Sequence, residues 1–244
     1  MESTDVELVS TDDGSVAHLT IPGGPLTART ARELADAAAS IRETRSIRVV
    51  TLAARGDFCS GPGDDLDVFD LRPDPASALA ALRPPVVVGI DGPCLGEGLE
   101  VALAADLRLA TGRSRFALDH LRRGRLPAWG GSQRLPRCVR PGTAVGLAML
   151  GTELSADEAR GLGLIHQVAE DLPTAMADVV TTLAARGPLA LELTKEAVHR
   201  GSELPLRDGL RLEGDLNHQL AASEDRAEGL QAFFDRRPPD FGGR

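Results

Sequence analysis

The sequence predicts an α/β fold with a helical C-terminal part. Short β-branched apolar runs, typical of buried strands, alternate with segments of helical periodicity through the first two thirds of the chain. From Leu172 to Phe234 the pattern is helical almost throughout, with breaks at Gly187-Pro188 and Leu204-Pro205. We therefore expect an α/β core over residues 1–186 and a helical region over residues 187–244.

Composition narrows the class of protein. A chain of 244 residues with 42% hydrophobic residues can bury a sizeable core. The formal net charge of −9 argues against a nucleic-acid partner, which would require a basic face. Three scattered cysteines are too few for a disulfide framework or a zinc site, so we expect no metal. The N-terminus has no apolar signal-like segment and no apolar run reaches spanning length, which predicts a cytoplasmic protein with no membrane association.

The central stretch covers residues 86–106. Val86–Ile90 is an apolar run behind two prolines and predicts a buried strand. A glycine-rich turn follows, and Leu99–Ala105 predicts a packed helix that is apolar except for Glu100. Such a turn directs free backbone N–H groups to one place, where the helix macrodipole adds about half a positive charge. This arrangement suits an anion or an oxyanion; the alternative is a tight turn whose acidic residue only offsets the dipole.

The segments before this stretch have recognisable boundaries. Two predicted strands flank an Asp-Asp-Gly turn, and Thr27 is placed to cap a helix that reaches about Ile41. The expected elements are strands at 6–9, 16–21 and 47–52, helices at 27–41 and 73–82, and a Gly/Pro/Asp-rich loop at 56–65.

The segments after it continue the alternation. Ser155-Ala156-Asp157-Glu158 is a capping box that opens a short helix. Further expected elements are strands at 107–110 and 164–168, an extended segment at 114–118, a turn into a helix at 126–134, and a helix at 142–149.

Five segments together carry a family resemblance. Phe58-Cys59-Ser60-Gly61 with Asp65-Leu66 resembles an F-x-A-G-x-D-L loop, and the others are Pro84–Asp106, Phe116–Leu135, Gly151–Val168 and Asp225–Gly242. Nearly end to end, the sequence is similar to the crotonase (enoyl-CoA hydratase/isomerase) family. The resemblance implies a crotonase-type ββα spiral core with a helical C-terminal trimerisation region. It also implies an acyl-CoA thioester as ligand, a homotrimer or hexamer, and no cofactor, because coenzyme A is part of the substrate.

The resemblance also implies roles for particular residues. The backbone N–H groups of Ser60 and Glu97 would hold the thioester oxygen as an enolate forms, and one such donor is typically worth about 10²–10³ in rate. Glu100 matches one acid/base carboxylate of the hydratases, and the second falls on His120. The substrate-binding positions implied by the same alignment are Asp65, Leu66, Gly96, Trp129 and Arg236.

Three departures from the family pattern bear on the chemistry. The usual Gly-Gly-Gly is Gly96-Glu97-Gly98, so Glu97 must point away, pair with an arginine, be protonated or take part in the chemistry, unless it only caps the helix. Asp119 replaces a proline and would orient His120 only if the backbone turns there, since in an extended segment the two side chains diverge. His120 is either an acid/base near neutral pH or a position without a catalytic role. The segment 66–83 is short, which leaves the shape of the acyl pocket open.

Arg122, Arg123 and Arg125 either bind coenzyme A phosphates or face water. The favoured function is hydration or dehydration of an enoyl-CoA-type thioester. Isomerisation, decarboxylation and thioester hydrolysis use the same oxyanion chemistry and remain alternatives. A non-catalytic, crotonase-like partner protein is the alternative from another class.

Overall fold

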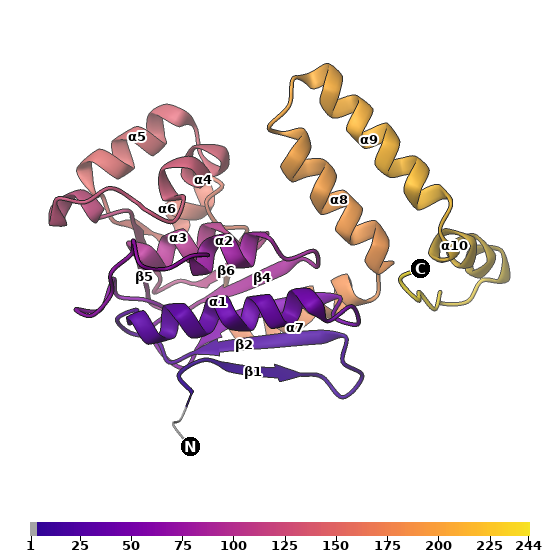
Figure 1. The fold of residues 1–244 in the computed structure, drawn as a ribbon, viewed down its shortest axis with the longest axis horizontal. Helices are drawn as coiled ribbons and strands as arrows, with labels where there is room; N and C mark the ends of the chain where they lie inside the picture. Colours follow the sequence, from indigo (N-terminus) through magenta and orange to yellow (C-terminus); the bar gives the residue numbers. More distant parts are fainter. Residues whose placement is uncertain (1–3) are drawn as a thin grey trace. The chain divides into compact units, whose positions relative to one another are not determined.

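A computed structural model describes residues 4–244 of the chain (Figure 1). The chain forms two compact units, one made of residues up to 82 with 86–180 and the other of 83–85 with 181–244. The division lies within helix α7 (Leu172–Ala184). The functional division predicted at residue 187 stays a prediction. Of the helices formed by residues 4–244, none combines the length and apolar character needed to span a bilayer.

The first unit is built on a six-stranded sheet of order β1-β2-β3-β4-β6-β9. Strand β1 is antiparallel to β2, and every other neighbouring pair is parallel. The inner strands are almost fully buried, as parallel strands covered on both faces require. The bounds are β1 Glu7–Ser10, β2 Val16–Ile21, β3 Val49–Ala54, β4 Val86–Ile90, β6 Leu107–Thr111 and β9 Gln167–Ala169.

Strand β4 divides its side chains between two layers. Val86, Val88 and Ile90 belong to the main apolar cluster, together with residues of α1 (Ala28–Glu43), α2 (Pro75–Ala80) and α3 (Glu97–Leu103). Gly89 faces the other way, where a Cβ would lie 2.0 Å from the sulfur of Met176 in α7. The glycine therefore lets α7 pack directly against the centre of the sheet.

The predicted helix boundaries follow from side-chain caps. Thr27 accepts a hydrogen bond from the Thr30 N–H and begins α1, and Ser155 with Glu158 forms the predicted capping box of α6 (Ala156–Gly161). The predicted strands and helices before residue 86 are confirmed, with shifts of two residues or fewer at most ends.

A second, three-stranded sheet of order β5-β7-β8 lies within the first unit, with strands Pro93–Leu95, Arg115–Ala117 and Leu154–Ser155. Strand β5 falls inside the segment that the sequence predicts to be a turn. It forms because Cys59 tethers it: the Cys59 N–H donates to the Pro93 carbonyl at 2.8 Å, and the Leu95 N–H donates to the Cys59 carbonyl at 3.0 Å. The loop at 56–65 is thereby fixed beside the start of α3.

Short helices complete this unit. The basic segment forms a 3₁₀ turn, η1 (His120–Arg123), followed by α4 (Gly131–Cys138) and α5 (Pro141–Leu150). Helix α5 is apolar around most of its circumference, yet Val145, Met149 and Leu150 are exposed.

The second unit is helical. It contains the end of α7, α8 (Pro188–Gly201), α9 (Leu206–Ala221) and α10 (Glu224–Asp235). Buried Asp225 fixes the C-terminal segment, because its carboxylate accepts hydrogen bonds from the N–H groups of Gly242 and Gly243 at 2.8 and 2.9 Å. A helical C-terminal region is thus confirmed.

Candidate active site

Helix α3 carries two fully buried glutamates, Glu97 and Glu100. The chain enters this helix through Gly96, whose φ of 52° is strained for residues that carry a side chain. One position further, a Cβ on Gly98 would lie 2.3 Å from the Cβ of Cys59. Gly98 therefore lets the loop at 56–65 lie against the beginning of α3, and Gly96 supplies the positive φ and the space for Arg123 and Asp119.

Glu100 is held by backbone N–H groups at the beginning of α4. Its Oε1 accepts hydrogen bonds from the N–H of Trp129 at 2.8 Å and from the N–H of Gly131 at 2.7 Å. A Cβ on Gly131 would lie 2.9 Å from the Glu100 Cγ, so the close approach depends on glycine. One carboxylate oxygen thus serves as a cap for α4, and the other, Oε2, is left for a second partner.

That partner is His120. Its Nε2 lies 3.0 Å from Glu100 Oε2 and 3.7 Å from Glu97 Oε1, and its side chain is 1% exposed. An ionised carboxylate only accepts, so with Glu100 in that form the hydrogen bond is donated by Nε2. The other ring nitrogen, Nδ1, is buried and has no hydrogen-bond partner among the described residues. The structure therefore brings together the two residues that the sequence assigns to acid/base chemistry.

Glu97 points into the protein. Its Oε1 contacts the Arg125 guanidinium, and its Oε2 lies 3.4 Å from Arg123 Nη2. The alternative that Glu97 projects outward and only caps the helix is therefore wrong. Pairing with arginine, one of the options that the sequence left open, is what offsets the burial of this carboxylate.

Asp119 engages Arg123. Its two oxygens accept hydrogen bonds from Arg123 Nη1 at 2.8 Å and from Nη2 at 3.2 Å. The sequence expects Asp119 to orient His120 only if the backbone turns there. The backbone does turn at η1, but it directs the Asp119 carboxylate to Arg123, and Glu100 bonds the imidazole instead.

The two predicted oxyanion donors differ in availability. Glu97 is the first residue of α3, where a backbone N–H has no acceptor within the helix. The Ser60 N–H instead donates to the Gly24 carbonyl at 3.0 Å. A thioester oxygen would reach the Ser60 N–H only by displacing that bond.

The predicted substrate-binding residues occupy several environments. Leu66 and Trp129 are buried, and the Trp129 indole donates to the Val68 carbonyl at 3.2 Å. Exposed Asp65 accepts a hydrogen bond from the Ala28 N–H at 3.2 Å and supports the start of α1. Gly96 lies directly beneath the Arg123 guanidinium, and Arg236 is exposed at the end of α10 in the second unit. Their contacts with substrate stay predictions.

Two buried cysteines, Cys59 and Cys94, pair with each other through a β-bridge next to the beginning of α3. Burial raises the pKa of the Cys59 thiol to about 11, and the Glu97 charge contributes to the increase. Burial likewise raises the pKa of Cys94 well above its ordinary value. Neither thiol is available as a thiolate near neutral pH. Among residues 4–244, no group of three or more His, Cys, Asp or Glu side chains is placed to bind a metal ion.

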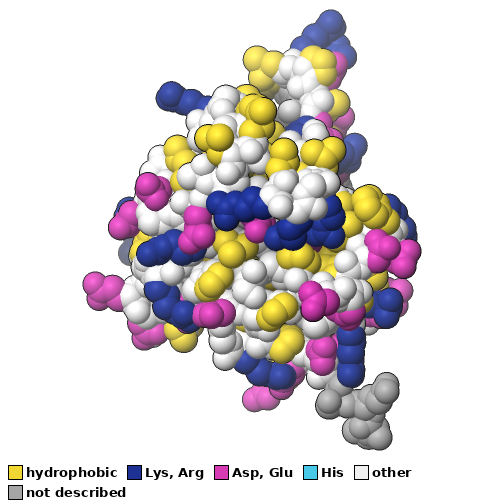
Figure 2. All heavy atoms as spheres, turned by 90° about the vertical axis from the view of Figure 1, so that its left-hand side faces the viewer, with side chains coloured by type: hydrophobic (Ala, Val, Ile, Leu, Met, Phe, Trp, Pro, Cys, Tyr) yellow, Lys and Arg dark blue, Asp and Glu magenta, His cyan; other side chains and the backbone are white. Residues whose placement is uncertain are grey.

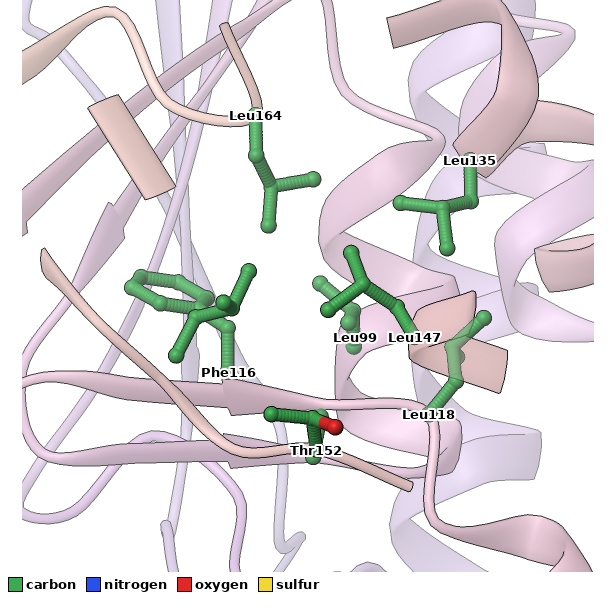
Figure 3. A pocket seen from close by; sticks show the side chains of 9 residues that line it. Leu99, Phe116, Leu118, Leu135, Leu147, Thr152 and Leu164 are labelled. Carbon is green, nitrogen blue, oxygen red and sulfur yellow. The ribbon is translucent and has the colours of Figure 1, made fainter. Parts of the chain in front are cut away.

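A small apolar pocket lies on the other side of α3 (Figure 3). Leu99, Phe116, Leu118, Leu135, Leu147 and Leu164 point into it, and Thr152 supplies the polar hydroxyl at its edge. Leu99 and Glu100 are consecutive residues, so the helix that carries the buried carboxylate also forms part of the wall of this pocket. On the surface, Figure 2 shows basic side chains gathered across the middle of one face with apolar side chains beside them.

Comparison with known proteins places this site in a family. The model of the enoyl-CoA hydratase/isomerase family matches residues 15–244. The human mitochondrial enoyl-CoA hydratase domain-containing protein 2 is 35% identical over 230 residues, which cover 87% of this chain and 79% of that protein. The (E)-benzylidenesuccinyl-CoA hydratase of Thauera aromatica is 32% identical over 231 residues, covering 86% and 88%.

Solved structures of enoyl-CoA hydratases have the same fold as this chain. A crystal structure of an enoyl-CoA hydratase from Bacillus anthracis superposes with a TM-score of 0.89 at 29% identity, over 98% of this chain and 100% of that one. The chain belongs to the enoyl-CoA hydratase/isomerase family and has the crotonase fold. It is accordingly a member of a family of enzymes that act on acyl-CoA thioesters.

The arginine pair is the part of the site that sequence reasoning did not assign. The sequence leaves coenzyme A phosphates or water as the partners of Arg123 and Arg125, and in the structure both side chains contact Glu97. The available signal was the combination of an extra acidic residue at 97 with a basic cluster in a neighbouring family segment.

Proposed function

We propose that this protein stabilises the enolate of an acyl-CoA thioester and catalyses the hydration or dehydration of an enoyl-CoA-type substrate. The observation that carries the proposal is the buried hydrogen bond between Glu100 and His120 in a chain of this family. The names of relatives such as the Thauera hydratase support the reaction class.

In this proposal, Glu100 and His120 transfer the protons. Glu100 acts as general base toward water, or as acid toward a leaving hydroxyl, through Oε2, which bonds His120 alone, whereas Oε1 is occupied by two N–H groups. His120 manages the proton at Cα. The N–H of Glu97 is one oxyanion donor. The N–H of Ser60 is the second only if its bond to the Gly24 carbonyl is replaced.

The direct contact between the two residues also favours a second candidate. Hydration uses two proton-transfer groups with water between them and the substrate, whereas Glu100 and His120 share one hydrogen bond at 3.0 Å. A His oriented by a carboxylate can act as a single base through its other ring nitrogen, here the buried Nδ1 that has no hydrogen-bond partner among the described residues. Such a unit suits double-bond isomerisation, decarboxylation or thioester hydrolysis.

We also propose that the protein self-associates and works without a cofactor. The exposed apolar side chains of α5, together with Leu121 and Leu126, provide a surface that self-association into a trimer or hexamer would bury. No cofactor is needed, because the thioester itself supplies the acidified Cα. A cytoplasmic location stays a prediction.

The test is a panel of saturated and α,β-unsaturated acyl-CoAs incubated with the protein in heavy water and analysed by mass spectrometry. Enolate formation incorporates deuterium at Cα, hydration changes the mass by one water, decarboxylation removes carbon dioxide, and hydrolysis releases coenzyme A. Glu100→Gln and His120→Asn should each lower turnover by about 10²–10⁴, the usual contribution of a general acid or base. Glu153→Gln, which changes an exposed glutamate, is the matched control.

The outcomes separate the candidates. A water adduct that depends on both residues supports hydration, and exchange or rearrangement without a water adduct supports the second candidate. If Glu100→Gln leaves every activity unchanged, the catalytic proposal fails. Binding of acyl-CoA without exchange or turnover would indicate a non-catalytic partner protein.

A further inference from the structure

We propose that the guanidinium of Arg123 is a hydrogen-bond donor to the thioester oxygen, in the place where this family resemblance implies a backbone N–H of the loop at 58–63. The inference rests on the proposed function, because it assumes an enolate at this site. It concerns a side chain that the sequence did not assign to catalysis.

The loop itself has few donors to give. The N–H groups of Cys59, Ser60 and Gly63 already donate to the carbonyls of Pro93, Gly24 and Leu26, at 2.8, 3.0 and 2.7 Å. Pro62, one of the two apparent extra residues, has no N–H. An oxyanion could therefore be bonded by Cys59, Ser60 or Gly63 only at the expense of the bonds that hold the loop in place. The N–H of Gly61 donates to no backbone carbonyl among the described residues, and this residue is the one that lies beside Arg123.

Arg123 lies where the missing donor would be needed. A Cβ on Gly96, at the start of α3, would lie 2.8 Å from Arg123 Nη2. A Cβ on Gly61, in the loop, would lie 3.9 Å from Arg123 Nη1. The guanidinium thus spans the space between the two segments to which the resemblance assigns the oxyanion donors.

The hydrogen bonds of the guanidinium leave a donor for a ligand. Of its five N–H groups, Asp119 takes one on Nη1 and one on Nη2, and Glu97 is nearest to the other on Nη2. Two N–H groups remain, the one on Nε and one on Nη1, and Nη1 is the nitrogen that is nearer to Gly61. The side chain is 33% exposed, so a ligand can approach it.

The surrounding charges fix this geometry. Asp119 and Glu97 hold the planar guanidinium from two sides, and Arg125 pairs with Glu97. Because Glu97 pairs with both arginines, its single negative charge offsets the charge of Arg123 only in part. The result is a fixed cation at the oxyanion position that needs no reorganisation when charge develops, which is the condition for efficient electrostatic catalysis.

The step is balanced with groups of the chain. His120 or Glu100 removes the Cα proton, the electron pair of the broken C–H bond forms the Cα–C double bond, and the carbonyl π pair moves to the thioester oxygen. Arg123 donates a hydrogen bond to that oxygen and keeps its proton. Return of a solvent-derived deuteron to Cα regenerates the thioester and records each enolate formed.

The experiment measures Cα deuterium exchange of butyryl-CoA, together with its dissociation constant by calorimetry. The variants are Arg123→Gln, Arg123→Lys and Arg137→Gln; Arg137 is an exposed arginine that bonds only a carbonyl of its own helix among the interactions described. We expect Arg123→Gln to slow exchange about 10²–10³-fold with the dissociation constant changed less than about threefold. Arg123→Lys, which keeps the charge without the planar fork, should be intermediate, and Arg137→Gln should match the wild type.

Other results overturn the inference. Exchange by Arg123→Gln at the wild-type rate would show that Arg123 does not contact the oxyanion, while leaving the proposed function intact. Weaker binding with an unchanged rate at saturation would assign Arg123 to the coenzyme A phosphates. No exchange by the wild-type protein on any acyl-CoA of the panel would refute the proposed function and this inference together.

A second measurement guards against a folding defect. The ligand is a coenzyme A thioether carrying a nitronate, whose charged oxygens imitate the enolate. Arg123→Gln should weaken its binding by about the same factor by which the substitution slows exchange. Butyryl-CoA should not lose affinity to the same extent. Equal losses for both ligands would indicate a disordered site and would contradict the specific role of Arg123.

Discussion

Replacing Glu97 by glutamine tests the charge cluster at the start of α3. The change keeps the size of the side chain and removes the carboxylate on which Arg123 and Arg125 converge. It leaves two guanidinium groups beside His120 with only Asp119 as a carboxylate partner for Arg123. We expect a loss of stability, because a charge compensated in the folded state loses its partner.

The size of the effect follows from burial. Removing one partner of a buried ion pair typically costs about 3–5 kcal/mol. Glu97 is fully buried, but the side chains of Arg123 and Arg125 are 33% and 30% exposed, so water can solvate part of the charge that is left. We therefore expect about 2 kcal/mol, which for a chain of this length corresponds to a fall in Tm of about 4–8 °C.

A double-mutant cycle with Arg125→Gln isolates the interaction. Melting curves by circular dichroism at pH 7 give the four Tm values, and the double variant should be more stable than the sum of the single losses predicts. We expect a coupling energy of at least about 1 kcal/mol. Glu7→Gln is the control, because Glu7 pairs with Arg55 at 3.1 Å with both side chains about half exposed; its change should stay within about 0.5 kcal/mol.

Two results would refute this reasoning. If Glu97→Gln melts within about 1 °C of the wild type, the carboxylate contributes nothing to the folded state. If the cycle shows strict additivity, Glu97 and Arg125 do not interact in solution as the structure describes. Either result would also weaken the role of Arg123 as a fixed donor, since Glu97 is one of the two groups that hold it.

Two further predictions concern the same region. Gly131→Ala places a Cβ 2.9 Å from Glu100 Cγ and should displace the carboxylate. Turnover should fall at least about tenfold, and the fold should lose about 1–3 kcal/mol of stability. Gly142→Ala, which has open space around it, should change neither turnover nor stability. Iodoacetamide at pH 8 should leave Cys59 and Cys94 unmodified, because burial raises the pKa of both thiols and keeps them protonated. Half-buried Cys138 should react, and peptide mass analysis distinguishes the three sites. Prompt labelling of Cys59 in the folded protein would contradict this reasoning.

Much of the fold could be predicted from local pattern. The apolar run at 86–90 and the capped helix after Thr27 lie where the sequence places them, since burial and capping act over a few residues. Strand β5 was missed because its pairing partners are distant: it contacts Cys59 on one side and β7 on the other. A three-residue strand that begins with proline has no pattern of its own to reveal it.

The site was predictable to a different degree for each residue. Family motifs identify Glu100 and His120, and the structure places them in contact. The hydrogen bond from the Gly131 N–H at the beginning of α4 to Glu100 is a tertiary contact, which residue spacing along the sequence does not predict. The same holds for Ser60, whose N–H is occupied by Gly24 from a segment far away in the sequence.

The arginines show how a local feature and a tertiary one combine. Gly124 ends the 3₁₀ turn in the left-handed region, with φ of 64°, and so reverses the chain between Arg123 and Arg125. Because of this reversal, both side chains reach Glu97 although one residue separates them. A buried glutamate at position 97 is compatible with folding only where such cations return to it. The change of Gly-Gly-Gly to Gly-Glu-Gly and the basic turn around Gly124 therefore form one feature, and neither segment explains the buried ion pairs of Glu97 without the other.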